Sequence, residues 1–172
     1  MLTLPGQLKP GDNPGLVEIH VSGKPVAWAR AGSHVINGKP VHFTPTNYRR
    51  WYQDARMMAR QAMEGRKILT GCVQVQVFIS IVPPKSWPAW KLEAALDHRI
   101  EPSGTPDLSN LVKAAEDACS GVVFLDDAQI VCGRQNEIYS EEPWVHIRVI
   151  PRNTSPATIK RRSDLKQQGA GK

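Results

Sequence analysis

No apolar run in the sequence approaches the roughly 18 residues that a membrane-spanning helix requires. The opening stretch, MLTLPGQLKPGDNPG, lacks the charged start and apolar middle of a signal peptide. The three cysteines are scattered, with no CxxC spacing and no paired histidine motif, so they predict neither a disulfide framework nor a zinc site. We therefore expect a cytoplasmic protein without a membrane partner.

Charge is unevenly distributed along the 172 residues, whose net charge is +6. Residues 30–67 carry eight basic and two acidic side chains, and residues 93–142 carry three basic and eleven acidic ones. The last 22 residues carry six basic and one acidic. An acidic segment between two basic ones is typical of an enzyme that holds phosphates with Lys and Arg and cations with carboxylates. Chance segregation of surface charge is the alternative that this pattern leaves open.

Hydrophobic periodicity predicts an α+β protein with one domain over residues 16–150. A lead-in rich in Pro and Gly (1–15) precedes this domain, and a flexible basic tail (151–172) follows it. The expected architecture is a mixed sheet of about five strands with two to three helices packed against it. Strands are expected at 16–21, 72–82, 129–139 and 144–150, a loop or hairpin at 32–41, and helices beginning at Thr44-Pro45, after Pro88 and after Asp107.

The first expected helix has Thr44 as its N-cap and Pro45 at its first position. One face is apolar and should pack on the sheet, and the opposite face is rich in arginine. The arginine row is either a solvated helix face or a track for phosphates, and the pattern leaves both open. The apolar face contains Trp51, Ala55, Met58, Ala59 and Ala62, and the opposite face contains Arg49, Gln53, Arg56 and Arg60.

The pattern of segment 106–119 predicts an amphipathic helix with acidic residues before and after it. Asp107 precedes the helix, where a carboxylate can cap backbone amides. Gly121 ends the helix, and a short apolar link leads to Asp126-Asp127. On its polar face lie Asn110, Lys113 and Asp117.

Only a helix and a short link separate Asp107 from Asp126-Asp127, so the two acidic groups can lie at the same end of the core. Asp107 and one of the Asp126-Asp127 pair would then face a common cavity, with Lys113 one to two turns away. Mg²⁺ takes oxygen ligands, can activate a bound water and clamps a phosphate, and a nearby lysine stabilises the charge that develops. Taken singly, these residues have simpler interpretations as an N-cap, a solvated helix lysine and a turn.

Their joint order is more specific. Asp-Leu-Ser-Asn-Leu-Val-Lys-Ala-Ala-Glu-Asp-Ala, starting at Asp107, is followed after a short link by Phe-Leu-Asp-Asp-Ala-Gln-Ile-Val, ending at Val131. This resembles the RusA-like Holliday junction resolvases, whose pattern is Asp-x-Asp-Asn-x-x-Lys-Ala-x-x-Asp-Ala, a short link, a hydrophobic pair and Asp-Asp-x-Gln-Val. Weaker similarity, in Gly23-Lys24-Pro25-Val26 with Arg30 and in Phe43-Thr44-Pro45, extends the resemblance over roughly residues 16–150.

The resemblance implies a homodimer, bacterial or phage-encoded, that nicks four-way DNA junctions symmetrically in recombination and repair. It implies one Mg²⁺-dependent acidic site per subunit, with Mn²⁺ as a substitute. It assigns the metal ligands to Asp107 and Asp127, with Asp126 as a third ligand or a residue that orients one, and Lys113 as the cation that faces the phosphate. Asn110 would hold Asp107 or a water, and Arg30, Arg49, Arg56 and Arg60 are the candidate contacts to the DNA arms.

Ser109 is a departure, because the family has a second acidic residue at this position. A hydroxyl reaches a metal only as a weak neutral ligand or through water, so either Asp126 or Asp117 compensates, or metal affinity or cleavage falls. Some RusA-like relatives also have this serine, and we expect an active enzyme. The alternatives are a branched-DNA-binding protein with a degenerate site and a metal-dependent phosphotransferase or nucleotide hydrolase, although the chain lacks a Walker-type glycine loop.

Overall fold

The computed structural model describes residues 15–28, 32–36, 39–104 and 106–152. The expected lead-in and basic tail therefore lie almost wholly outside the described residues. No helix in the described part is long and apolar enough to cross a membrane. The elements are β1 (Val17–Ser22), β2 (Gly32–Ile36), β3 (Lys39–Phe43), α1 (Thr46–Ala62), β4 (Val73–Ile81), α2 (Ala89–Leu96), α3 (Leu108–Cys119), the short 3₁₀ helix η1 (Asp127–Gln129), β5 (Ile130–Tyr139) and β6 (Trp144–Pro151).

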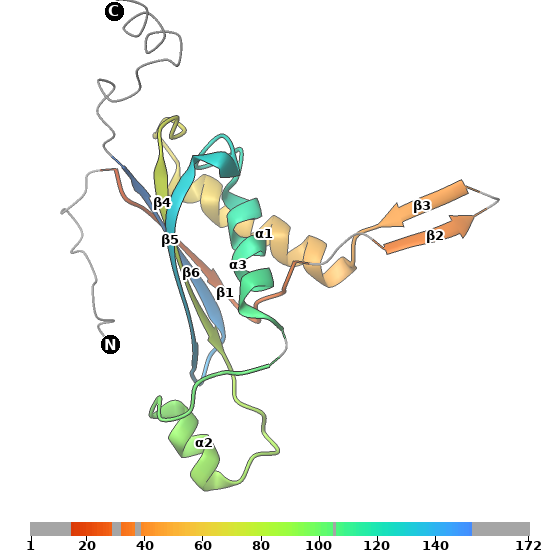
Figure 1. Cartoon of the computed structure of the whole chain (residues 1–172), viewed down its shortest axis with the longest axis vertical. Coiled ribbons are helices and arrows are strands. Elements are labelled where there is room, and N and C mark those ends of the chain that lie inside the picture. Colours follow the sequence, from red (N-terminus) through yellow and green to blue (C-terminus); the bar gives the residue numbers. More distant parts are fainter. Residues whose placement is uncertain (1–14, 29–31, 37–38, 105, 153–172) are drawn as a thin grey trace, which may run out of the picture.

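The main sheet is mixed and has the strand order β1-β6-β4-β5. β6 is antiparallel to both β1 and β4, whereas β4 and β5 are parallel and are joined by a crossover through α3. The sheet is mixed, as expected, but in the described part of the chain it has four strands instead of about five. The other two strands, β2 and β3, form a separate antiparallel hairpin that projects from the body (Figure 1). Residues 37–38, where the Asn-Gly turn is expected, lie outside the described residues.

Helices α1 and α3 cover one face of this sheet (Figure 1). Apolar side chains at every second position of β1, Val17, Ile19 and Val21, are buried beneath them. Alanines form much of the α1–α3 contact, where Ala55, Ala59, Ala114, Ala115 and Ala118 are fully buried. Because alanine has only a methyl group, the two helices can approach closely, and a larger side chain there would overpack the core.

The start of α1 differs from the expectation. Thr44 is not the N-cap; Pro45 is, and no side chain caps this end of the helix. The Pro45 carbonyl accepts the first helical hydrogen bond, from the Arg49 N–H at 3.0 Å, while Pro45 itself keeps an extended ψ of 135°. The expected apolar face is confirmed, because Trp51, Ala55 and Ala59 are buried and their neighbours Met58 and Ala62 pack partly against the core.

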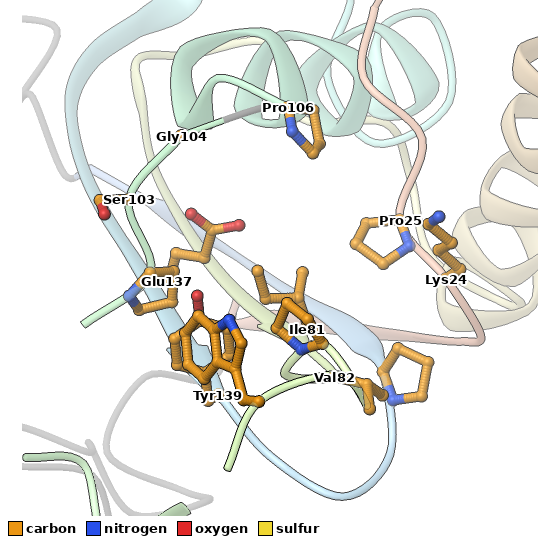
Figure 2. Close-up of a pocket in the computed structure, with 13 residues that line it drawn as sticks. Lys24, Pro25, Ile81, Val82, Ser103, Gly104, Pro106, Glu137 and Tyr139 are labelled. Carbon is orange, nitrogen blue, oxygen red and sulfur yellow. The ribbon is translucent and has the colours of Figure 1, made fainter. Parts of the chain in front are cut away.

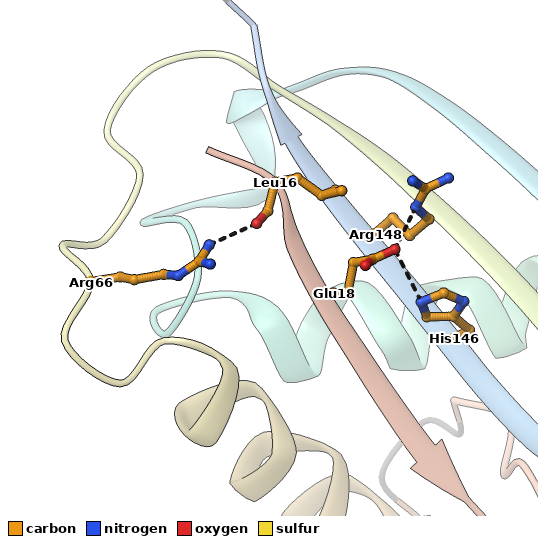
Figure 3. A network of polar contacts seen from close by, with 5 residues as sticks. All are labelled: Leu16, Glu18, Arg66, His146 and Arg148. Atoms are coloured by element: carbon orange, nitrogen blue, oxygen red, sulfur yellow. Dashed lines mark hydrogen bonds and ion pairs between the residues drawn. The ribbon is translucent and has the colours of Figure 1, made fainter. Parts of the chain in front are cut away.

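The sheet face opposite the helices carries a polar network on β1 and β6 (Figure 3). Oε1 of Glu18 lies 3.0 Å from Nε of the nearly buried Arg148 and 3.7 Å from Nε2 of His146. Burial lowers the pKa of His146; Glu18 opposes this effect, and His20 and Arg148 reinforce it. Nearby, Arg66 donates to the Leu16 carbonyl at 2.7 Å and so joins the loop after α1 to the residue before β1.

Candidate active site

Asp107 caps the N-terminus of α3, as expected. Its Oδ1 accepts from the Ser109 backbone N–H at 3.1 Å, and its Oδ2 accepts from the Ser109 hydroxyl at 3.0 Å. Both carboxylate oxygens therefore have a hydrogen bond from the same residue, while the side chain stays exposed. We expect Asn110 to hold Asp107 or a water; in the structure, the groups that hold Asp107 are the backbone N–H and the hydroxyl of Ser109. The orientation of Asp107 is thus set locally.

Asp107 lies in a cleft at the carboxyl end of β5, which we call the Asp107 cleft. The cleft is lined by Glu101, Asp107, Leu108 and Glu137, with Gln135 and others. Burial raises the pKa of Glu137, and its Oε1 is buried without a hydrogen-bond partner. Sequence reasoning missed Glu137, although strand alternation over 129–139 places it on the same sheet face as Gln135. Only the crossover through α3 brings it beside Asp107.

Lys113 is exposed on α3 and makes two contacts that keep it near the site. Its Nζ lies 3.4 Å from Oδ1 of Asp117 and 5.5 Å from the centroid of the Trp28 ring. The backbone N–H of Trp28 donates to the Asn110 carbonyl at 2.9 Å, which holds the Trp28 backbone against α3. The Lys113 side chain therefore lies on the polar face of α3, as expected.

The Asp126-Asp127 turn is held by Gln129. The Gln129 Oε1 accepts from the Leu125 and Asp126 N–H groups at 2.7 and 3.0 Å, and its Nε2 donates to the Leu69 and Gly71 carbonyls at 3.0 and 2.6 Å. Asp126 in turn accepts from the Ala128 N–H at 2.8 Å. The glutamine of the motif thus fastens the turn to the chain that enters β4.

Asp107 and the Asp126-Asp127 pair do not share a cavity within one chain. Asp107 precedes α3 and Asp126-Asp127 follow it, before β5, so the twelve-residue helix, which is roughly 18 Å long, lies between them in the chain. The cleft that contains Asp107 is not lined by Asp126 or Asp127, so the described part of one chain does not bring the expected residues into a common cavity. Among the described residues, no three His, Cys, Asp or Glu side chains are placed to hold a metal ion. Within the described part of one chain, Asp107 and the Asp126-Asp127 turn therefore do not form a three-carboxylate cluster.

Glu116, another residue that sequence reasoning missed, lies near the far end of α3. Burial raises its pKa; Lys113 acts in the opposite direction, and Asp117 and Asp127 add to the increase. The negative charge of Asp127 therefore acts on Glu116, in the last turns of α3.

The arginines expected to contact DNA do not form one uniform row. Arg56 turns toward α3 and donates to the Ser120 carbonyl at 2.8 Å, so it caps the C-terminus of that helix. Arg49 and Arg60 are exposed, and Arg30 lies outside the described residues. A cavity between the helices is lined by Arg49, Arg56, Asp117, Ser120, Thr44 and the tyrosines 48 and 52. Burial, with Asp117 and Tyr52, raises the pKa of Tyr48 to about 12.

A protein-family model described as "Endodeoxyribonuclease RusA" matches residues 22–150. The match includes Asp107, Lys113 and the Asp126-Asp127 turn. The chain belongs to the RusA endodeoxyribonuclease family. It is also 30% identical over 135 residues to a protein of Bacillus subtilis (strain 168) described as "Uncharacterized protein YqaN", covering 77% of this chain and 94% of that one. The match confirms the resemblance identified from the motif. Membership in the RusA family implies that the protein is a nuclease.

Proposed function

We propose that the protein is a structure-selective endodeoxyribonuclease that resolves Holliday junctions by paired nicking. The observation that carries this proposal is the RusA family match over residues 22–150, which includes every motif carboxylate. The exposed arginines Arg49 and Arg60 and the Lys113 side chain are available to phosphates. A four-way junction has two equivalent cutting positions, so a two-fold symmetric enzyme suits it.

The separation of Asp107 from Asp126-Asp127 supports a homodimer as the active form. In the described sheet, β5 is an outer strand with a single neighbour, and most of its residues are exposed. Val131, at its start, and Leu125, in the loop before it, are large apolar side chains that are 56% and 55% exposed. An unpaired strand edge with exposed apolar groups is suited to pair with another strand.

Antiparallel pairing of two β5 strands about a two-fold axis would complete the site. In such a pair, the carboxyl end of one strand meets the amino end of the other. Glu137 and the Asp107 cleft of one subunit would then lie beside Asp126 and Asp127 of the partner subunit. Each dimer would hold two composite acidic sites, one at each end of the paired strands.

In each composite site the residues have separate roles. Asp107 is oriented by Ser109, and the partner's Asp126-Asp127 turn is oriented by its own glutamine. These oxygens are the donors that Mg²⁺ prefers, and Mn²⁺ can replace it; the bound ion would supply an activated water and charge for the phosphate. Lys113 would neutralise charge on the scissile phosphate. Hydrolysis would leave a 3′-hydroxyl and a 5′-phosphate.

A cleavage assay on a synthetic four-way junction with Mg²⁺ tests the proposal. We expect symmetric paired nicks with the wild-type protein, and a loss of at least about 100-fold for Asp107→Asn. Glu64→Gln, an exposed position after α1, is the matched control and should keep wild-type activity. Tight junction binding without cleavage by the wild type would instead support a branched-DNA-binding protein with a degenerate site.

Mixing two inactive variants tests the composite site. A heterodimer of Asp107→Asn and Asp127→Asn subunits contains one intact site, formed by the unmutated aspartate of each subunit. Random 1:1 exchange should therefore restore about a quarter of the wild-type sites, and these should give unpaired nicks. If each site lay within one chain, the mixture would stay as inactive as its components, and the β5 dimer would be rejected.

A further inference from the structure

A second cavity, of about 410 Å³, lies next to the Asp107 cleft at the carboxyl ends of β4 and β5 (Figure 2). Glu137, Pro102 and Gly104 line both hollows, so the two are adjacent and share a wall. The volume is within the usual range for small-molecule sites. We call this cavity the Glu137 pocket.

The walls of the Glu137 pocket are mostly apolar, with five prolines and two aromatic rings. They include Pro25, Pro84, Pro106, Trp87 and Tyr139. Trp87 and Tyr139 meet edge to face with ring centroids 5.5 Å apart, and Nζ of Lys91 lies 3.7 Å over the Trp87 ring. These contacts hold the aromatic wall in place before any ligand arrives. Such a surface suits a planar heterocycle.

Glu137 is the one acidic side chain among the residues that line this pocket. Its carboxylate points into the space bounded by Pro25 and Pro106 (Figure 2). Its Oε1 is buried and has no hydrogen-bond partner. A buried polar atom without a partner is costly, so this oxygen is suited to accept a hydrogen bond from a ligand. Lys24, at the edge of the same pocket, is exposed and can meet a phosphate.

From this arrangement we infer that the Glu137 pocket holds one unpaired nucleobase that carries an amino group, next to the cutting site. The inference rests on the proposed function, because an unpaired base arises where a junction is opened. Cytosine, adenine and guanine each present an N–H₂ that can donate to Glu137. Thymine offers one ring N–H between two carbonyl oxygens, which a carboxylate repels. The pocket therefore selects the base beside the scissile phosphate.

Titration of the four deoxynucleoside monophosphates in metal-free buffer tests the pocket directly. Backbone amide shifts of Gly104, Glu137 and Tyr139 would be followed by NMR. We expect saturable shifts with the three amino-bearing nucleotides and about tenfold weaker binding of the thymidine nucleotide. Glu137→Gln should remove this preference, because a carboxamide both donates and accepts. Glu141→Gln, exposed and outside the lining, should retain it.

Cleavage of junctions that differ only in the base beside the cut gives an independent measurement. Wild-type protein should prefer an amino-bearing base over thymine by about tenfold, and Glu137→Gln should cut both substrates at similar rates. Cleavage without discrimination, together with no amide shifts at millimolar nucleotide, would overturn the pocket and leave the proposed function intact. Nucleotide binding without junction cleavage would instead support the pocket and reject the proposed function.

Discussion

At the residue scale, Ser109 and Asp107 form a self-contained unit. The Ser109 hydroxyl donates to the carboxylate at 3.0 Å, where the family pattern has a second acid that repels Asp107 when no cation is bound. The serine therefore orients Asp107 without a cation, at the cost of one negative charge for the metal. A neutral residue at position 109 is therefore compatible with Asp107 as the N-cap of α3.

Ser109→Asp should strengthen cation binding at this position. A second carboxylate beside Asp107 repels it when no cation is present, so a divalent ion gains affinity by relieving the repulsion. We expect the Mg²⁺ concentration for half-maximal junction cleavage to fall by about tenfold. Ser109→Asn, which is neutral, is the control. Equal Mg²⁺ dependence for the two variants would show that Ser109 is not beside the metal.

Arg56 and Arg60 should separate into a structural and a DNA-binding arginine. Arg56→Ala leaves the Ser120 carbonyl at the end of α3 without its charged donor, so we expect a loss of about 1.5–3 kcal/mol in the free energy of unfolding. Arg60→Ala should leave stability within about 0.5 kcal/mol and weaken junction binding with a shallower salt dependence. Urea denaturation and binding at several salt concentrations measure the two effects. A stable Arg56→Ala protein would contradict the capping role.

At the element scale, the loop between α3 and β5 is an anchored connection. Val123 and Phe124 are fully buried, and the Leu69 N–H donates to the Val123 carbonyl at 2.8 Å. Gly121 opens the loop with a φ of 69°, a left-handed conformation that favours glycine. The loop thus delivers Asp126-Asp127 to a defined place beside the start of β4.

Gln129→Leu should loosen this loop without affecting Asp107. The variant removes four hydrogen bonds between Gln129 and the backbone, and we expect it to cost about 1–3 kcal/mol of unfolding free energy. Junction cleavage should fall at least about tenfold at a temperature where the variant is folded. Gln61→Leu, on the exposed end of α1, is the matched control for both measurements. Unchanged cleavage would mean that the turn needs no such anchor.

At the scale of the whole molecule, two faces of one sheet have different character. Helices cover one face, and Glu18, His146 and Arg148 lie on the other (Figure 3). Because burial lowers the pKa of His146 below its ordinary value of 6.5, the unfolded chain takes up a proton more readily than the folded one. Stability from this residue is present above pH 6.5 and is lost as the pH falls toward the lowered value.

His146→Gln should therefore reduce the loss of stability on acidification. Urea denaturation at pH 7.5 and pH 5.5 should show a smaller difference in unfolding free energy for the variant than for the wild type. His98→Asn replaces an exposed histidine whose φ is 58°, a conformation that asparagine tolerates, and serves as the control. Identical pH dependence in wild type and His146→Gln would show that other groups set the acid sensitivity.

The sequence by itself determined the elements, the helix cap at Asp107, the buried faces and the family. These features depend on periodicity and on hydrogen bonds between residues a few positions apart, such as Asp107 with Ser109. The fastening of Gln129 to the chain before β4 joins residues about sixty positions apart, and no local pattern encodes it.

Only the tertiary structure decided where the acidic groups lie. Asp107 and Asp127 are twenty positions apart, a separation compatible with a shared cavity or with opposite ends of a helix. The parallel pairing of β4 and β5 settles the matter, because the crossover must carry the chain back along the full length of the strands, and α3 does so. The same crossover places Glu137 beside Asp107. It also brings the C-terminus of α3 to Arg56, which donates to the Ser120 carbonyl there.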